Sequence, residues 1–561
     1  MFVPKLVSAL QEGYGLPSFR KDALAGLTVA IVALPLAMAI AIASGTTPDK
    51  GLYTAVIAGF LISALGGSRH QIGGPTAAFV IVVYGVIEKH GFDGLVLATL
   101  MAGGMLILLG TLKLGTLIKF IPYPVVTGFT SGIALVILST QIKDFFGLEM
   151  AKVPADFVAK WGAYAEAAPS VDLPSTAIAL VTLAIIVAIR HWRPSWPGML
   201  IGVAAATALV QVFHLPVETI EGRFGAIPNH LPAPEFPVGV TWQRLYELLP
   251  SAITIALLAG IESLLSCVIA DGMTGRRHRS NIELVAQGIA NIASGLFGGL
   301  PATGALARTA TNIKAGALTP VSGMLHAVFL LGFMWLLAPL AGMVPLAALA
   351  GVLVIVAWNM SEIDRLRHAV RAPRGDQLVL AVTFLLTVLV DITVALEVGI
   401  VLAALVFIRR MVGSTDVAAI TGRDLAERAE TEAGAQALAD LQVPKGVEVF
   451  EISGPFFFGV AGMLADILDR IEKPPQVFIL RMGNVPVIDA TGVDALESFI
   501  DRNQARGTKV MLTRVQGLPL RVLQEMGLVD KLGSDGLQPN LTAALTRAAA
   551  VIDAAGTPAA T

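Results

Sequence analysis

Two short segments that contain glycine and proline are the first candidates for chemistry in this chain. They are residues 73–79 (Gly-Gly-Pro-Thr-Ala-Ala-Phe) and residues 299–305 (Gly-Leu-Pro-Ala-Thr-Gly-Ala). They occupy matching places in the two halves of the chain, which is typical of inverted-repeat transporters whose substrate lies between interrupted helices. Free N–H groups at two facing helix N-termini would attract an anion without a charged side chain. The alternative is a pair of ordinary kinks, since glycine and proline are common in transmembrane helices.

Arg308 follows the second of these segments and is the only charged residue in the stretch 303–313. A cation inside a membrane costs about 2.5–3.5 kcal/mol or more. An anionic substrate would offset that cost, and we therefore interpret Arg308 as a substrate ligand. The alternative is an arginine that reaches the membrane surface or has a structural ion-pair partner.

Glu262 is the only charged residue in the apolar stretch 252–270. Uncharged surroundings favour the protonated form of a carboxyl group, which would suit a proton carrier in coupled transport. A fixed structural role, for instance as the partner of Arg308, is the alternative. Ser266 lies four residues further on, so it shares a helix face with Glu262 and is a possible accessory ligand.

The amino-acid composition indicates that much of the chain forms membrane-spanning segments. Hydrophobic residues make up 55% of the 561 residues and charged residues 14%, against about a quarter charged in soluble proteins. The net charge of −2 gives no electrostatic argument for nucleic-acid binding. The single cysteine, Cys267, excludes an intramolecular disulfide and is expected to be a small buried residue. No metal cluster, cofactor-binding loop or nucleophile–base pair is evident, so we expect no enzyme, no metal and no cofactor.

The membrane part is expected to contain fourteen helices. Twelve is the alternative count, because Asp391 and Glu397 interrupt the last two apolar segments. The segments begin near Ala23, Gly51, Pro75, Leu95, Ile121, Leu173, Gly198, Leu249, Ile282, Thr303, Thr319, Val344, Leu378 and Ile392. Seven helices in each half is an odd number, so the second half must be inverted relative to the first.

The distribution of lysine and arginine predicts that both termini are cytoplasmic. With fourteen helices, most basic residues fall on the side of the N-terminus, including the Arg-Arg-His-Arg run at 276–279. In the loop that holds this run, Asn281 and Glu283 are expected to cap the next helix. The opposite loops hold only Lys50, Lys89, Lys143, Lys152, Lys160, Arg223 and Arg244.

Charged residues become frequent after Arg410, which indicates a soluble C-terminal domain. The predicted division is a cytoplasmic N-terminus at 1–22, a transport domain at 23–410, a linker at 411–444, a soluble domain at 445–555 and a tail at 556–561. In the soluble part, residues 447–452 and 477–480 read as strands, and 461–471 as a helix. Asp489 or Thr491 is a good N-cap for a further helix.

Three stretches resemble the sulfate permease (SulP) family of anion transporters. They are Gly26-Leu-Thr-Val-Ala with Pro35 and Gly51-Leu-Tyr, then Gly73-Gly-Pro-Thr-Ala, and the long run from Glu262-Ser-Leu-Leu through Asp271-Gly-Met-Thr-Gly to Ala307-Arg-Thr. The sequence around Glu262 and the segment Trp358-Asn-Met-Ser-Glu most resemble a bacterial branch of the family that carries C4-dicarboxylates. Sulfate is the usual substrate of the family.

The resemblance implies a fold of two inverted seven-helix repeats, divided into core and gate domains, with a cytoplasmic α/β STAS domain at the C-terminus. It implies a secondary active anion transporter of a bacterial inner membrane, proton-coupled or exchanging anions, that works by elevator-like alternating access. A homodimer and a cytoplasmic regulator of the STAS domain are the expected partners. Thr491 is nearest to the phosphorylated serine of related STAS proteins. The expected substrate site comprises Pro75, Thr76, Ala77, Ala78, Ala307 and Arg308.

Two departures from the family pattern leave the substrate open. Leu36 follows Pro35 where many members have glutamine, and Ala307 precedes Arg308 where some have serine. Glu262 matches proton-linked members, whereas sodium-coupled bicarbonate carriers have aspartate there. The competing hypotheses are a bicarbonate carrier, a nucleobase carrier and a membrane receptor with a STAS output domain. A neutral nucleobase would not compensate the charge of Arg308.

Overall fold

The computed structural model describes residues 3–116, 122–150, 153–154, 156–193, 196–237, 239–361, 363–390, 392–419, 443–457 and 474–556. The chain divides into two compact units, Met1–Ala403 and Ala404–Thr561. The predicted helix at 461–471 and most of the predicted linker lie outside the described residues. Each unit is described by itself.

The first unit is helical and contains a helix at each of the fourteen predicted positions. Its helices are α1 (Lys5–Gln11), α2 (Leu16–Ala43), α3 (Pro48–Leu65), α4 (Val80–Thr111), α5 (Tyr123–Thr140), α6 (Ile142–Phe146), α7 (Phe157–Ala167), α8 (Leu173–Trp192), α9 (Gly198–Phe213), α10 (Ile220–Phe224), α11 (Trp242–Thr274), α12 (Ser280–Leu296), α13 (Leu306–Lys314), α14 (Val321–Gly342), α15 (Leu346–Met360), α16 (Ile363–Ala369), α17 (Arg374–Leu389) and α18 (Ile392–Gly413), the last of which continues past Ala403. The third and fourth predicted segments both fall within α4, which a non-helical residue, Gly91 (φ 72°, ψ 178°), divides into two helical parts.

Seven helical segments in the described part of the chain are at least 18 residues long and apolar enough to cross a bilayer. They include α2, α4 together with the preceding residues 77–79, α11 and α14. The first of them begins at Leu16, earlier than expected, and so includes the charged residue Asp22. Asp22 is fully buried because its carboxylate accepts hydrogen bonds from the backbone N–H groups of Leu318 and Thr319 and from the Tyr14 hydroxyl.

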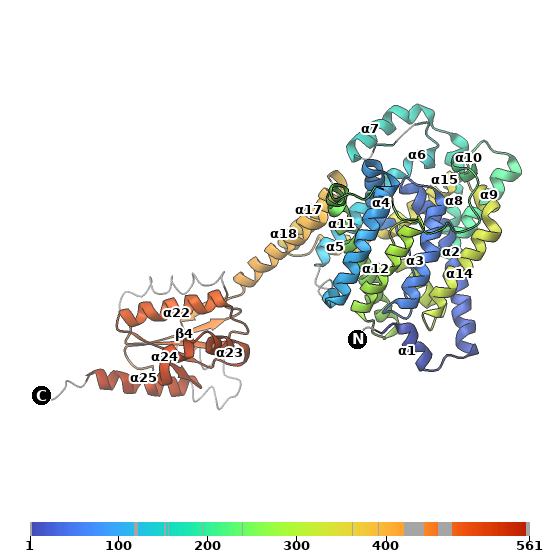
Figure 1. Cartoon of the computed structure of the whole chain (residues 1–561). Helices are drawn as coiled ribbons and strands as arrows, with labels where there is room; N and C mark the ends of the chain where they lie inside the picture. Colours follow the sequence, from blue (N-terminus) through green and yellow to red (C-terminus); the bar gives the residue numbers. More distant parts are fainter. Residues whose placement is uncertain are drawn as a thin grey trace. The chain divides into compact units, whose positions relative to one another are not determined.

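The helices pack in two groups. In the first group, α4 contacts α11 and α12, and α14 contacts α2 and α3; in the second, α5 contacts α17, and α15 contacts α8. Figure 1 shows α6, α7 and α10 gathered at one end of this unit, with α1 and the N-terminus at the other. Helices α4 and α12 approach closely because they meet at Gly103 and Gly288, where a Cβ would lie within 2.7 Å of the facing backbone oxygen.

The second unit contains a five-stranded sheet in the order β3-β4-β5-β6-β7. Strand β3 is antiparallel to β4, and the other neighbours are parallel, as expected for an α/β domain. The elements are β3 (Asp416–Ala419), β4 (Val447–Ser453), β5 (Val477–Asn484), α22 (Ala490–Ala505), β6 (Lys509–Thr513), α23 (Gly517–Glu525), α24 (Leu528–Gly536), β7 (Leu537–Gln538) and α25 (Leu541–Gly556).

Alternate side chains of β5 pack against different helices of this unit. Phe478 packs in the cluster that contains Phe499 of α22, whereas Ile479 packs in the cluster that contains Leu545 of α25. A sheet covered on both faces explains why β5 is an uninterrupted apolar run over its first half.

Candidate functional site

The two glycine–proline segments of the sequence lie side by side. Gly73 and Gly74 form strand β1, and Thr303 and Gly304 form β2, which pairs with it antiparallel. The Ala305 N–H extends this pairing by donating to the Ile72 carbonyl oxygen at 2.7 Å. Two helical segments start immediately afterwards, a 3₁₀ turn (Ala77–Phe79) that leads into α4, and α13. The pairing therefore brings two helix N-termini to one place.

Arg308 projects from the first turn of α13 toward the other segment. Its side chain is buried, at 2% exposed, and Nη2 donates a hydrogen bond to the Pro75 carbonyl oxygen at 3.1 Å. Its Nε and Nη1 atoms have no hydrogen-bond partner in the part of the chain that the structure describes. Gly74 leaves room for the guanidinium, because a Cβ at that position would lie 2.6 Å from Nη1. The arrangement offers two nitrogen atoms whose N–H groups are unused and one uncompensated charge.

Glu262 lies on α11 beside the other segment. The Thr76 hydroxyl donates a hydrogen bond to Glu262 Oε2 at 2.9 Å. Among the described residues, no ion pair joins Glu262 to Arg308. The carboxylate and the guanidinium thus contact adjacent residues, Thr76 and Pro75, without contacting each other.

The remaining predicted ligands differ in exposure. Pro75, Ala77 and Ala78 are buried, Thr76 is partly buried and Ala307 is exposed. Their side chains, apart from the Thr76 hydroxyl, are apolar, so anion contacts there would come from backbone N–H groups. The Ser266 hydroxyl donates to Thr309 Oγ1 at 3.1 Å and thereby joins α11 to α13.

A polar network behind the two strands was not predicted from the sequence. Gln71 donates from Nε2 to the Ser263 carbonyl oxygen and accepts from Cys267 Sγ. The Ser263 hydroxyl is 2.8 Å from Thr303 Oγ1 and accepts from the Gly304 N–H. Cys267 is fully buried, as predicted. These contacts fix both crossing segments to α11.

A second support comes from α12. Asn291 donates to the carbonyl oxygen of Ala302 and accepts from its N–H, at 2.9 and 2.8 Å. Asn291, Gln287 and Glu283 follow one another at intervals of four residues along one face and are all fully buried. Three polar residues at helical spacing inside an otherwise apolar segment were the available sequence signal.

The prediction that Asn281 and Glu283 cap α12 is wrong. The N-cap is Arg279, and no side chain makes a capping hydrogen bond there. Glu283 instead accepts from the Gly67 N–H at 2.7 Å, and Asn281 Oδ1 accepts from the Gly115 N–H. Both side chains are used for packing between distant segments, which local spacing could not reveal.

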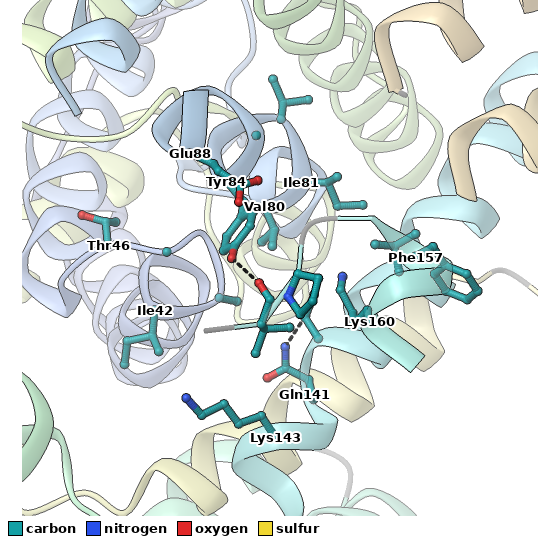
Figure 2. A pocket seen from close by; sticks show the side chains of 18 of the residues that line it. Ile42, Thr46, Val80, Ile81, Tyr84, Glu88, Gln141, Lys143, Phe157 and Lys160 are labelled. Carbon is teal, nitrogen blue, oxygen red and sulfur yellow. Dashed lines mark hydrogen bonds between the residues drawn. The ribbon is translucent and has the colours of Figure 1, made fainter. Parts of the chain in front are cut away.

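A cavity of about 630 Å³ lies between the two helix groups. Its wall includes Val80, Ile81 and Val82 at the start of α4 but neither Arg308 nor Glu262. Figure 2 shows it from close by, with Lys160 on α7 and Gln141 and Lys143 at and just after the end of α5. The cavity thus begins next to the paired segments and extends toward the end of the unit that carries α7.

In the second unit, Thr491 is exposed in the first turn of α22. Asp489 is the N-cap of this helix, and its side chain accepts a hydrogen bond from the Gly492 N–H at 2.7 Å. The Thr491 hydroxyl is therefore not the capping group.

Comparison with known proteins identifies both units. The sequence profile of the sulfate permease family matches residues 19–383, and that of the STAS domain matches residues 439–544. YvdB of Bacillus subtilis (strain 168), a protein proposed to be a sulfate transporter, is 42% identical over 93% of this chain and 96% of its own length. The bicarbonate transporter BicA of Picosynechococcus sp. is 31% identical over 92% of each chain. The solved structure of SLC26A9 covers 98% of this chain with a TM-score of 0.85, and 93% of that chain is matched, at 18% sequence identity, so this likeness concerns the fold.

Proposed function

Because the chain belongs to the sulfate permease family of anion transporters, we propose that it is a secondary active transporter of small anions whose substrate binds at Arg308. The family membership establishes the anion-transporter class, and the SLC26A9 structure shows the fold. The substrate site, the coupling ion and the mechanism are the proposed parts.

The observation that carries this proposal is the state of Arg308. A fully buried guanidinium with two N–H-bearing atoms unpaired is costly unless a ligand of opposite charge is present for part of the cycle. The β1–β2 pairing places two helix N-termini beside it, and their N–H groups attract the same kind of ligand. Arg308, Ala307 and residues 75–78 would together surround the anion.

We assign proton coupling to Glu262. Its carboxylate accepts from Thr76, which is part of the proposed site, so a change in its protonation would change the contacts of that site. Protonation of Glu262 and binding of an anion near Arg308 would each remove charge from the same apolar surroundings. The alternative is that a sodium gradient, and not a proton gradient, drives transport.

The substrate is proposed to be sulfate or a C4-dicarboxylate. The name of YvdB supports sulfate, and the name of BicA makes bicarbonate the alternative. Alanine at positions 77, 78 and 307 leaves the anion few side-chain hydrogen bonds, which favours recognition by charge and backbone. The dicarboxylate proposal rests only on the sequence resemblance given above.

Further proposals concern the whole protein. Both termini are proposed to be cytoplasmic, in a bacterial inner membrane, with fourteen membrane-spanning helices in two inverted repeats. The two helix groups would move relative to each other in elevator-like alternating access. A homodimer and regulation of transport through the STAS domain, with Thr491 as the phosphorylated residue, complete the proposal.

The decisive experiment is uptake by the purified protein in proteoliposomes. Sulfate, succinate, fumarate, bicarbonate and uracil should be compared, with and without gradients of protons and sodium. Saturable uptake of one or more anions driven by a proton gradient is the expected result. Uptake of uracil alone would favour a nucleobase carrier, and no uptake at all would favour a receptor.

A further inference from the structure

Lys160 is another buried cationic residue, which the proposed transport site does not use. It lies in α7 and is 3% exposed, although α7 itself lies in the connection between two predicted membrane helices. No residue that the structure describes forms a hydrogen bond or ion pair with its Nζ atom. An ammonium group without a partner among the described residues, on a residue that is only 3% exposed, is free to bind an anion.

The nearest carboxylates do not supply that partner. Asp156 is the N-cap of α7, and its side chain accepts from the Ala159 N–H at 2.8 Å. Glu88 of α4 lies close enough to attract the Lys160 charge but forms no ion pair with it. Asp156 and Glu88 therefore act on the Lys160 charge only by long-range electrostatic attraction.

Tyr164 is a second buried donor on α7. It is one helical turn further along α7 and therefore on the same face. It is 5% exposed, and its hydroxyl group also has no hydrogen-bond partner among the described residues. Tyr164 does not line the cavity described next, so the cationic donor that can meet an anion there is Lys160.

The space for a ligand is the cavity of about 630 Å³, whose wall includes Lys160. Figure 2 shows the Lys160 side chain extending from α7 toward the first turns of α4, where Val80 and Ile81 lie. Gln141 and Lys143 line the same wall, but their side-chain donors already bind the carbonyl oxygens of Ile137 and Met150, respectively. An anion in this cavity would lie on the path between α7 and the start of α4.

We propose that Lys160 anchors a second binding site for a small anion, separate from Arg308, at the end of the cavity formed by α7. The inference rests on the proposed function for the identity of the anion, which would be one of the transported class. Its role is to hold the anion before it moves to the paired segments. This would raise the local anion concentration at low supply.

The binding test uses the Arg308→Ala variant of the full chain, so that the proposed transport site is removed. Sulfate, fumarate and bicarbonate are titrated separately at constant ionic strength, and Tm is followed together with tryptophan fluorescence, since Trp161 packs against Tyr164. A saturable rise in Tm is expected with at least one anion. Adding Lys160→Gln should weaken that binding at least tenfold.

The matched control is Lys89→Gln, because Lys89 lines the same cavity but is exposed. This change in the Arg308→Ala background should leave the binding within twofold. Lys160→Met and Lys160→Arg provide further variants if the glutamine variant is unstable: methionine should abolish binding, and arginine should retain it within a few-fold. Absence of saturable binding in Arg308→Ala, or equal binding after Lys160 is replaced, would overturn the inference.

A transport test separates this inference from the proposed function. With Arg308 intact, Lys160→Gln should raise the half-saturating anion concentration several-fold and leave the maximal rate nearly unchanged. Unaltered uptake by this variant contradicts the second site, while failure of the wild-type protein to take up any anion contradicts the proposed function. The binding test on Arg308→Ala decides the second site in either case.

Discussion

Arg308 combines complete burial with two unpaired N–H-bearing atoms, and its contact with Pro75 fixes its direction. We predict that Arg308→Ala abolishes saturable anion uptake, because neither the charge nor the N–H donors remain. Arg308→Lys should retain only part of the activity, since a point charge does not replace the planar fork of an arginine. Uptake in proteoliposomes and Tm of the purified variants would be measured together. Wild-type affinity in a folded Arg308→Ala protein would refute the assignment.

Glu262 can change its charge in contact with Thr76, whereas a glutamine at that position cannot. Uptake by the wild-type protein is expected to accelerate as the external pH falls. Glu262→Gln should remove this pH dependence and leave anion exchange at constant pH measurable. The measurement is initial uptake rate against external pH for both proteins. A normal pH profile in the variant, or a sodium requirement in the wild type, would argue against this role.

Lys160 predicts a second pH dependence, that of anion affinity, which arises because a cation loses its charge as the pH rises. Burial lowers the pKa of Lys160 to about 8, and the attraction of Asp156 and Glu88 only partly opposes this. An anion binds the charged form, so its affinity for the second site should be full below pH 8 and fall as the pH rises above it. Other titratable groups in the wall of the cavity are Tyr84, Lys89, His90, Lys143, Asp144 and Arg223. Sulfate titrations of the Arg308→Ala protein between pH 6.5 and 9.5 (roughly 1.5 units on either side of this value) would show the loss, and an affinity independent of pH would contradict it.

The sequence indicated some of these residues and missed others for one physical reason. An isolated charge in an apolar segment is visible without a structure, and Arg308 and Glu262 were recognised in that way. Gln71 and Ser263 are uncharged, and their importance comes from partners far away in the chain. Lys160 lies in a connecting segment where lysine is common, so its burial was not predictable.

At the scale of elements, the close approach of α4 and α12 depends on glycine. Gly103→Ala would place a Cβ 2.7 Å from the Gly288 carbonyl oxygen, which is backbone and cannot move aside. We expect a loss of about 1–3 kcal/mol, typical of overpacking, and a lower Tm in detergent. Gly104→Ala is the control, since nothing lies within 4 Å of its added Cβ. Equal Tm values for the two variants would contradict the close packing of these helices.

Helix positions were predicted well because long apolar segments in a membrane have few alternatives to helix. The helical membrane transporter fold is confirmed by the SLC26A9 structure and by the family match. The separation of the third and fourth segments agrees with the structure, since Gly91 (φ 72°, ψ 178°) is non-helical and interrupts α4. The β1–β2 pairing could not be predicted from the sequence, because it joins two-residue strands from opposite halves of the chain.

At the scale of the whole molecule, the STAS domain is expected to act in assembly or regulation. Helix α18 ends at Gly413, and all residues of the proposed substrate site precede it. Truncation after Gly413 should therefore lower expression, dimer stability or maximal rate but leave substrate affinity within a few-fold. Affinity of the purified truncated protein, by binding or reconstituted uptake, is the measurement. Complete loss of binding in a folded truncated protein would show that the STAS domain shapes the site.

The pairing of β1 with β2 also has a consequence for the order of synthesis. Gly73 and Gly74 leave the ribosome long before Thr303 and Gly304, the only strand residues with which they pair among the described residues. Until then their backbone groups lack these partners, and unpaired backbone groups are costly in lipid. A nascent chain that has inserted its first seven predicted helices therefore still lacks half of its transport site. Transport competence should be acquired in one late step, when residue 308 has entered the membrane, and not gradually during elongation.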